Sequence, residues 1–262
     1  MSSAARASDA SVAEGGAAPI PGLHLRFGEL SMSGATMPWR ARGAGPNYAG
    51  WMIGTRHSYD RVADRYADEL GDELRGKPLD RGLLEVFAEL AGGGVVADVG
   101  CGPGHVAAYL AARGVRMIGM DLSPAMCGVA RTSVAVGAAD MTALPVRAQS
   151  LVGLVCLYAV IHLDRQQRAA AYAEFARVLR PGGHALIAFH TSDTDFPVGA
   201  AKTLTDWWGH QVDLTFRYLD PSAESEALAT AGLVPVARLD RAPHPDIEHP
   251  SRRSYLLVRR RP

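Results

Sequence analysis

The chain has 262 residues, with 27 Lys and Arg against 27 Asp and Glu, so its formal net charge is zero. Hydrophobic residues make up 48% of it and charged residues 21%, enough for a packed core. The lack of a basic excess argues against a nucleic-acid partner, and no apolar run reaches the roughly 18 residues of a membrane span. The three cysteines form no CxxC motif and are expected to be buried free thiols, as in a reducing cytosol.

The N-terminal part is predicted to differ from the rest. Residues 1–45 are rich in Ala, Gly, Ser and Pro and are expected to be largely disordered. They show no basic stretch followed by an apolar core, so we expect no secretory signal and a cytoplasmic location. Residues 46–262 are predicted to form a single domain. Within it, apolar residues from Tyr59 to Leu70 recur at spacings of three and four, which predicts a helix capped by Ser58 or Asp60.

Strand and helix patterns then alternate. A helix is predicted from Pro78 to the glycines at 92–94, and five apolar strand segments separated by amphipathic helices follow up to His190. This alternation predicts a parallel sheet with helices on both faces. A further helix and two strands are predicted after residue 220. Residues 191–219 form a long aromatic-rich connection, and long loops in compact domains are usually functional.

The first strand runs into the glycine turn of "VVADVGCGPGH", which is typical of a nucleotide-binding site. The dinucleotide fingerprint GxGxxG requires a small residue where this chain has His105. Asp98, two residues before Gly100, would repel a pyrophosphate but suits a cationic ligand. Asp121 ends the second strand, where an acid binds ribose hydroxyls in either cofactor class. Asp140 follows the third strand and can accept the amino group of an adenine.

These stretches, together with "YDRVADRY", "GMDLSPAM", "AADMTALP", "LVCLYAVIHL" and "RVLRPGGHALIAF", resemble the class I S-adenosylmethionine (SAM)-dependent methyltransferases, in the branch of quinone-biosynthesis and natural-product enzymes. The resemblance covers residue 58 to about 260. It implies an α/β, Rossmann-like sheet of seven strands in the order 3-2-1-4-5-7-6, with the last strand antiparallel. It also implies a small helical cap, formed by residues 46–75 and 191–219.

The same resemblance implies a role for each matching position. Backbone of the glycine turn would approach the cofactor, Asp98 would bind its ammonium, and Asp121 its ribose. The expected cofactor contacts are Tyr59, Tyr66, Asp98, Gly100, Cys101, Gly102, Asp121, Leu122, Asp140, Met141 and Tyr158. Tyr158 is expected to offer its carbonyl oxygen to the ammonium, and Tyr59 and Tyr66 to close over the carboxylate end.

The methyl acceptor is expected to be a small organic molecule, with oxygen the first choice and carbon or nitrogen left open. His162, after the fourth strand, is the candidate general base, because histidine titrates near neutral pH. Candidate substrate contacts are His190, Trp207, Trp208 and His210. His105 is expected to be structural. The Ala, Arg and Gly richness is typical of a high-GC bacterium, in which such enzymes tailor secondary metabolites.

Two other functional classes share part of this pattern. An NAD-dependent oxidoreductase is disfavoured by the glycine spacing and by Asp98. A SAM-binding protein without catalytic activity remains an alternative, because binding does not require turnover. No metal site, nucleic acid or membrane partner is expected, and the protein is expected to be a monomer or a homodimer.

Overall fold

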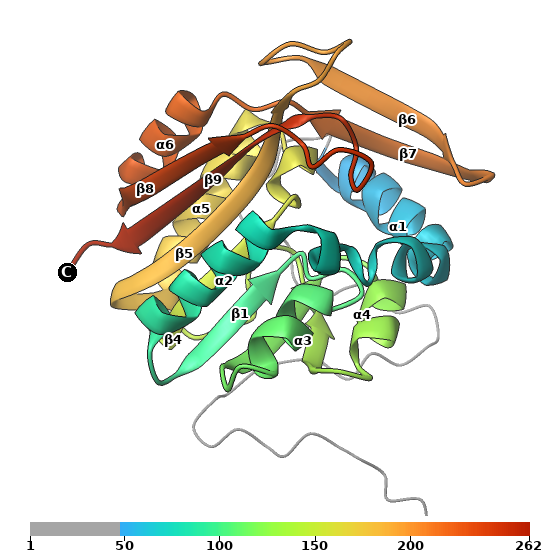
Figure 1. The fold of residues 1–262 in the computed structure, drawn as a ribbon. Coiled ribbons are helices and arrows are strands. Elements are labelled where there is room, and N and C mark those ends of the chain that lie inside the picture. Colours follow the sequence, from blue (N-terminus) through green and yellow to red (C-terminus); the bar gives the residue numbers. More distant parts are fainter. Residues whose placement is uncertain (1–47) are drawn as a thin grey trace, which may run out of the picture.

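The computed structural model describes residues 48–262 (Figure 1), so the expectation of disorder in residues 1–45 lies outside the described residues. Its α-helices are α1 (Tyr48–Leu70), α2 (Pro78–Ala91), α3 (His105–Ala111), α4 (Pro124–Ala130), α5 (Arg165–Val178) and α6 (Pro221–Thr230). Two short 3₁₀ helices are η1 (Glu73–Gly76) and η2 (Val160–His162). The strands are β1 (Val95–Val99), β2 (Arg116–Asp121), β3 (Ala135–Ala138), β4 (Leu151–Leu157), β5 (Leu179–Ser192), β6 (Ala201–Trp207), β7 (His210–Arg217), β8 (Leu233–Arg241) and β9 (Arg252–Arg260).

The main sheet has seven strands in the order β3-β2-β1-β4-β5-β9-β8. Strands β3, β2, β1, β4 and β5 pair in parallel, whereas β9 is antiparallel to both β5 and β8. Counted without the separate β6–β7 hairpin, this is the order 3-2-1-4-5-7-6, so the predicted fold class is confirmed. The parallel arrangement brings the carboxyl ends of β1, β2 and β4 to one edge, where ligands bind in open α/β sheets.

Helices cover both faces of the sheet, with α2 and α3 on one face and α5 and α6 on the other (Figure 1). Alternate residues of β1 serve the two cores: Val96 packs with Phe87 of α2, and Ala97 and Val99 pack on the side of Phe175 of α5. Both faces of β1 are therefore apolar, and all five of its residues are buried. This explains why the strand reads as a continuous apolar run interrupted only by Asp98.

Helix α1 differs from the expectation that a helix begins at Ser58 or Asp60. It already starts at Tyr48 and runs for 23 residues. Ser58 lies inside it, where its hydroxyl donates to the Gly54 carbonyl (2.7 Å) and accepts from the backbone N–H of Asp213 (2.8 Å). Asp60 instead accepts hydrogen bonds from Ser123 Oγ and the Ala125 N–H at the start of α4. The two polar residues thus tie α1 to distant elements rather than capping it.

The segment 191–219 also differs from the helical insertion that the resemblance implied. It forms the antiparallel hairpin β6–β7, closed by Trp208 and Gly209, which both have positive φ (53° and 80°). Two consecutive residues of this kind are typical of tight hairpin turns. The hairpin packs on α1 through Val62, Val212 and Leu214. The cap over the sheet edge therefore consists of one helix and one hairpin (Figure 1).

Candidate active site

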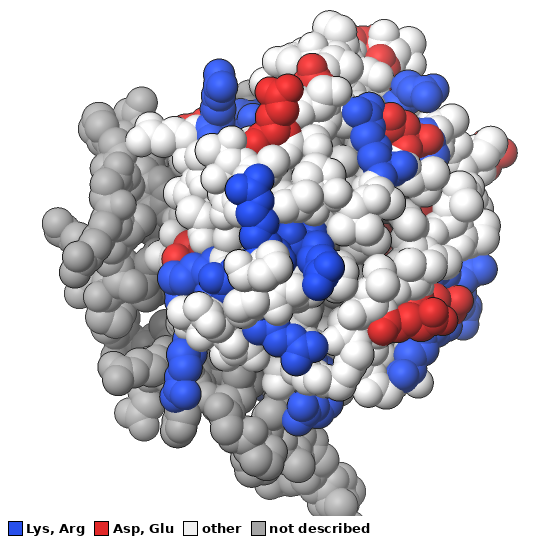
Figure 2. Space-filling model, turned by 90° about the vertical axis from the view of Figure 1, so that its left-hand side faces the viewer, with Lys and Arg blue, Asp and Glu red and all other residues white. Residues whose placement is uncertain are grey.

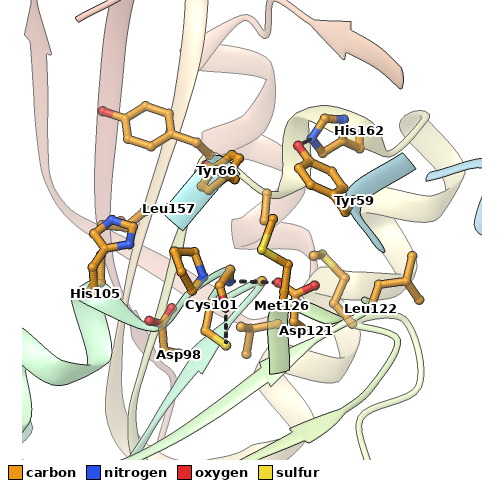
Figure 3. Close-up of a pocket in the computed structure, with 18 of the residues that line it drawn as sticks. Tyr59, Tyr66, Asp98, Cys101, His105, Asp121, Leu122, Met126, Leu157 and His162 are labelled. Carbon is orange, nitrogen blue, oxygen red and sulfur yellow. Dashed lines mark hydrogen bonds between the residues drawn. The ribbon is translucent and has the colours of Figure 1, made fainter. Parts of the chain in front are cut away.

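A cavity lies at the carboxyl ends of β1, β2 and β4, beneath α1 (Figure 3). Its walls contain all of the predicted cofactor residues: Tyr59, Tyr66, Asp98, Gly100, Cys101, Gly102, Asp121, Leu122, Asp140, Met141 and Tyr158. His162, the candidate base, lines the same cavity. Residues that come from six separate segments of the chain therefore meet in one place.

The glycine turn between β1 and α3 has a backbone that requires glycine. Gly100, Gly102 and Gly104 have φ values of 74°, 52° and 85°, a region that L-residues with a side chain rarely adopt. A Cβ at Gly100 would lie 2.3 Å from the Ala159 Cβ, whereas one at Gly102 would meet only Tyr66, at 3.9 Å. The Cys101 thiol is buried against Gly119 of β2. Backbone at Gly102 is thus open to a ligand.

Asp98 is the fourth residue of β1 and is only 2% exposed. Its Oδ2 atom is buried and has no hydrogen-bond partner. Burial raises the pKa of this carboxyl from 3.8 to about 7, against the lowering effect of the nearby His105. An unpaired buried carboxylate oxygen at the wall of a cavity is a position where a cationic group would be stabilised.

Asp121 is held at the end of β2 by backbone donors. Its Oδ2 accepts from the Gly102 N–H and its Oδ1 from the Ser123 N–H, both at 2.8 Å. Withdrawal from solvent raises the pKa of Asp121 to about 6, although these hydrogen bonds act in the opposite direction. The carboxylate is therefore fixed beside the glycine turn by two backbone donors.

The expected adenine end is formed by Leu122, Asp140 and Met141. Asp140 is 2% exposed, and its two oxygens accept from the Thr142 N–H and hydroxyl, at 2.8 Å each. Burial raises its pKa. In Figure 3, Asp121 lies between Asp98 and Leu122. Acids at successive points along the cavity fit a ligand whose ammonium lies apart from its nucleoside.

Tyr158 directly follows β4 and has a φ of 58°, an uncommon value for a residue with a side chain. Its backbone N–H donates to the Ala188 carbonyl of β5 (2.8 Å), and its hydroxyl forms a hydrogen bond of 2.5 Å with Tyr255 on β9. The side chain is thereby anchored in the sheet. Backbone strain of this kind persists only where surrounding contacts impose it.

His162, on η2, is buried, and both of its ring nitrogens are engaged. Nδ1 lies 3.0 Å from the carbonyl oxygen of Thr215 on β7, and Nε2 lies 2.7 Å from the Tyr59 hydroxyl. A carbonyl oxygen only accepts, so Nδ1 carries the proton and Nε2 accepts from Tyr59. Burial lowers the pKa of His162 from 6.5 to about 4, so its ring is neutral near pH 7.

The predicted substrate residues are not among those that line this cavity. His190 is packed behind Tyr158, with which it stacks at 5.0 Å between ring centroids, and its Nδ1 bonds to Ser251 (2.7 Å). Trp207 makes edge contacts with Tyr59 and Tyr66, and Trp208 stacks on Trp207. The two tryptophans therefore contact the wall tyrosines from outside.

His210 is exposed at the start of β7. The direct substrate contacts proposed for His190 and His210 thus find no support in this arrangement. Conversely, the cavity contains Glu73, Asp80 and His105, for which the sequence suggested no ligand role. Glu73 and Asp80 are not part of a recognisable sequence motif, whereas His105 directly follows the glycine turn. Within residues 48–262, no group of three or more His, Cys, Asp and Glu is placed to hold a metal ion.

Comparisons of the sequence and of the fold show which known proteins this chain resembles. The methyltransferase domain family matches residues 96–183. The chain is 34% identical over 151 residues to the ubiquinone/menaquinone biosynthesis C-methyltransferase UbiE of Syntrophotalea carbinolica, covering 54% of this chain and 63% of the relative. It is 30% identical over 149 residues to the mouse tRNA (carboxymethyluridine(34)-5-O)-methyltransferase ALKBH8, covering 56% of this chain but only 21% of that protein.

Among solved structures, the chain resembles the 1,6-didemethyltoxoflavin-N1-methyltransferase of Burkholderia thailandensis, a complex with 1,6-didemethyltoxoflavin and S-adenosylhomocysteine. The TM-score is 0.61 at 22% identity, and the match covers 92% of this chain and 99% of the other. At this identity the likeness concerns the fold. Residues 96–183 thus match the methyltransferase domain family, and the seven-stranded fold that carries them is similar to the fold of that solved methyltransferase.

Proposed function

We propose that the protein transfers a methyl group from SAM to a small organic acceptor, with a hydroxyl oxygen as the first candidate for the accepting atom. One observation carries the proposal: three acids at the ends of β1, β2 and β3, Asp98, Asp121 and Asp140, line one cavity beside an open glycine turn. Bound there, SAM would supply a methyl group on a positively charged sulfur, which the acceptor atom attacks in line.

The enzyme's own contribution is to position the acceptor and exclude water. A hydroxyl acceptor must also lose a proton, and the proposal assigns Tyr59 and His162 to take it. Tyr59 donates to Nε2 of His162, so a proton from the acceptor would pass to the Tyr59 oxygen as the Tyr59 proton passes to Nε2. Transfer of the methyl group to the acceptor oxygen would release a neutral thioether. Because Nδ1 donates to the Thr215 carbonyl, Nε2 is the ring nitrogen that accepts from Tyr59.

The relatives include tRNA methyltransferases, but charge favours a small acceptor. Nucleic-acid binding rests on contacts of Lys and Arg with phosphates, and this chain has equal numbers of basic and acidic residues. Figure 2 shows several basic side chains over the middle of one face, with uncharged surface between them and acidic side chains mainly toward its edges. No Lys or Arg is among the described residues that line the cavity.

Location and biological setting are parts of the same proposal. All three cysteines are buried and unpaired, which fits the reducing cytoplasm. Among the described helices, none combines the length and apolar character of a membrane span. A role in bacterial secondary metabolism is supported by composition and by the resemblance alone.

Isothermal titration with S-adenosylhomocysteine, with NADH as the control ligand, tests the cofactor. We expect micromolar binding of the first, no response to NADH, and loss of binding in Asp121→Ala. A response to NADH alone would refute the proposal. Methyl-labelled SAM offered with a panel of phenols, amines and bulk tRNA then tests the acceptor class, and incorporation into tRNA alone would exclude a small acceptor.

The base is tested with His162→Gln and Tyr59→Phe. For a hydroxyl acceptor we expect kcat to fall about 10²- to 10⁴-fold in His162→Gln, the usual contribution of a general base, with little change in the affinity for S-adenosylhomocysteine. An unchanged kcat in both variants would indicate an acceptor nitrogen or carbon that needs no base. No turnover of any acceptor by the wild type, despite tight cofactor binding, would favour a SAM-binding protein without catalytic activity.

A further inference from the structure

The carboxyl groups in the cavity wall are not equally compensated by positive charge. Those of the described lining residues are Glu73, Asp80, Asp98, Asp121 and Asp140. Lys77 binds Glu73 (2.7 Å), and Arg241 binds Asp80 (2.8 Å). Both cations lie behind the wall rather than in the lining. Two of the acids are therefore neutralised from outside the cavity.

The other three acids are held by neutral donors or by none. Asp121 accepts from two backbone N–H groups, and Asp140 accepts from Thr142. The Oδ2 atom of Asp98 is buried without a hydrogen-bond partner. Burial raises the pKa of Asp98 to about 7 and that of Asp121 to about 6, so both are ionised at pH 8. No Lys or Arg in the described part of the wall balances these charges.

The part of the wall around Tyr59 and His162, where the acceptor would react, offers no positive charge either. Thr55 precedes Tyr59 by one turn of α1 and lines the cavity, as does Leu163 directly after His162. His162 is neutral near pH 7, because burial lowers its pKa to about 4. Arg217, outside the lining, donates to the carbonyl oxygen of His162 (2.8 Å). The described wall at this end is thus uncharged.

The acids nevertheless act on this end of the cavity. Burial, the neighbouring Tyr66 and the charge of Asp121 all raise the pKa of the Tyr59 hydroxyl. The other imidazole of the wall belongs to His105, whose Nε2 contacts Glu73 (3.4 Å). An anionic group placed beside Tyr59 would therefore be repelled by carboxylates and would find no cationic partner. Burying an unpaired charge in this way is costly.

A bound cofactor does not remove the imbalance. SAM carries a sulfonium, an ammonium and a carboxylate, which leaves a single net positive charge against the acids without cationic partners. S-adenosylhomocysteine lacks the sulfonium and is neutral overall. With either molecule bound, the wall remains negative at pH 8, and the acceptor enters a site of that sign.

We propose that the acceptor site selects by charge: it admits neutral and cationic acceptors and excludes those that carry a carboxylate or a phosphate. This selectivity rests on the proposed function and narrows its substrate class. It works by repulsion of the wrong acceptor, which contributes to specificity as much as attraction of the right one does.

Isosteric pairs of phenols test the selectivity by isothermal titration of the full-length protein saturated with S-adenosylhomocysteine at pH 8. The probes are 4-hydroxyphenylacetate and 3-(4-hydroxyphenyl)propionate, each compared with its primary amide. The members of a pair differ in charge but hardly in size. Their phenol hydroxyls have pKa values of about 10 and stay protonated at this pH. Binding is measured without turnover, so the result does not depend on which atom is methylated.

We expect the wild type to bind each amide about 10- to 100-fold more tightly than the matching carboxylate. A carboxylate about 8 Å from one ionised acid, at an effective dielectric constant of about 20, is repelled by an amount that corresponds to about 30-fold in affinity. Thr55→Lys places an ammonium beside the acceptor and should reduce the ratio to below about threefold. Thr55→Met, of similar length and uncharged, is the matched control and should keep the ratio within about twofold of the wild type.

Both positions are buried, so the affinity of each variant for S-adenosylhomocysteine is measured first, as a check of folding. Leu163→Lys, with Leu163→Met as its control, brings the charge in from the other element and should have the same effect. If neither lysine variant binds S-adenosylhomocysteine, the wild-type ratios alone decide the selectivity.

Equal binding of amide and carboxylate by the wild type, or tighter binding of the carboxylate, would overturn the selectivity and leave cofactor binding in place. Failure of the S-adenosylhomocysteine complex to bind either amide would also overturn it, because the amides belong to the admitted class. A ratio that stays unchanged in a folded lysine variant would show that charge is not what the site selects. A wild type that does not bind S-adenosylhomocysteine would instead overturn the proposed function itself.

Discussion

Replacing Asp98 by Asn is expected to stabilise the free protein while it weakens cofactor binding. Asp98 is 2% exposed, with Oδ2 unpartnered, and burial raises its pKa from 3.8 to about 7. A shift of about three units corresponds to ~4 kcal/mol against the ionised form. Burying the neutral amide of Asn costs about 1–3 kcal/mol of this. The net gain is therefore about 2 kcal/mol where wild-type Asp98 is ionised.

The gain should depend on pH with a defined sign. Because the folded pKa of Asp98 is raised, its contribution to stability is fully present below pH 3.8 and is lost as the pH rises through about 7. At pH 8 we expect Asp98→Asn to raise Tm by about 4–8 °C, using about 2–4 °C per kcal/mol for a domain of this size. At pH 5 most of the difference should vanish.

Thermal unfolding of the ligand-free protein at the two pH values provides the assay. Asp64→Asn, at an exposed position of α1, is the matched control and should leave Tm unchanged at both. If Asp98→Asn unfolds at a lower temperature than the wild type at pH 8, then Asp98 is already satisfied in the free protein. The reasoning that assigns it to a cationic ligand would then be refuted.

Three further predictions concern other positions. Gly100→Ala places a Cβ 2.3 Å from the Ala159 Cβ at a φ of 74°, so we expect the free energy of unfolding in urea to fall by about 1–3 kcal/mol and S-adenosylhomocysteine binding to be lost. Unchanged stability and binding would contradict the close approach. Gly128→Ala, with open space around it, is the control. Asp164→Ala removes the side-chain acceptor of the capping box on α5, which binds the Gln167 N–H at 2.8 Å, and should cost about 1 kcal/mol in the same assay, whereas no change would show that the cap is dispensable. The depressed pKa of His162 implies a contribution to stability that is present above pH 6.5 and lost as the pH falls toward about 4. This acid-induced loss of stability, up to about 3 kcal/mol, should disappear in His162→Gln. If the variant loses the same stability in acid, groups other than His162 cause the loss.

Much of the fold and of the cofactor site could be predicted from local patterns. Apolar strands alternating with amphipathic helices predict a parallel sheet, and parallel strands bring their carboxyl ends to one edge. This is why Asp98, Asp121 and Asp140, each near the end of a strand, line the same cavity. The cap of α4 by Ser123 can also be predicted from the sequence, because its side chain accepts from the Met126 N–H, only three residues away.

Local patterns failed where a segment takes its structure from distant contacts. In the hairpin β6–β7, Val212, Leu214 and Phe216 alternate with polar residues, but the turn consists of Trp208 and Gly209 rather than a common turn pair. Its inward side chains, Val212 and Leu214, are buried only because α1 lies against them. The alternation at 212–216 indicates one strand, but the turn gives no sign of its pairing with a second strand, so the hairpin was missed. The start of α1 before Ser58 was also missed.

The sequence by itself determined the alternation of strands and helices, the glycine turn and the acids at the strand ends, because each follows from neighbours within a few residues and from the rules of parallel sheets. The strand order was implied only by the resemblance to the class I methyltransferases. Only the tertiary structure decided how the histidines are used. Tyr59 and His162 are 103 residues apart, and the carbonyl that sets the tautomer comes from Thr215. Likewise, His105 faces Glu73 only because η1 packs over the glycine turn. Such pairings depend on how whole elements pack, and no pattern of sequence spacing encodes the distance between two ring nitrogens and their partners.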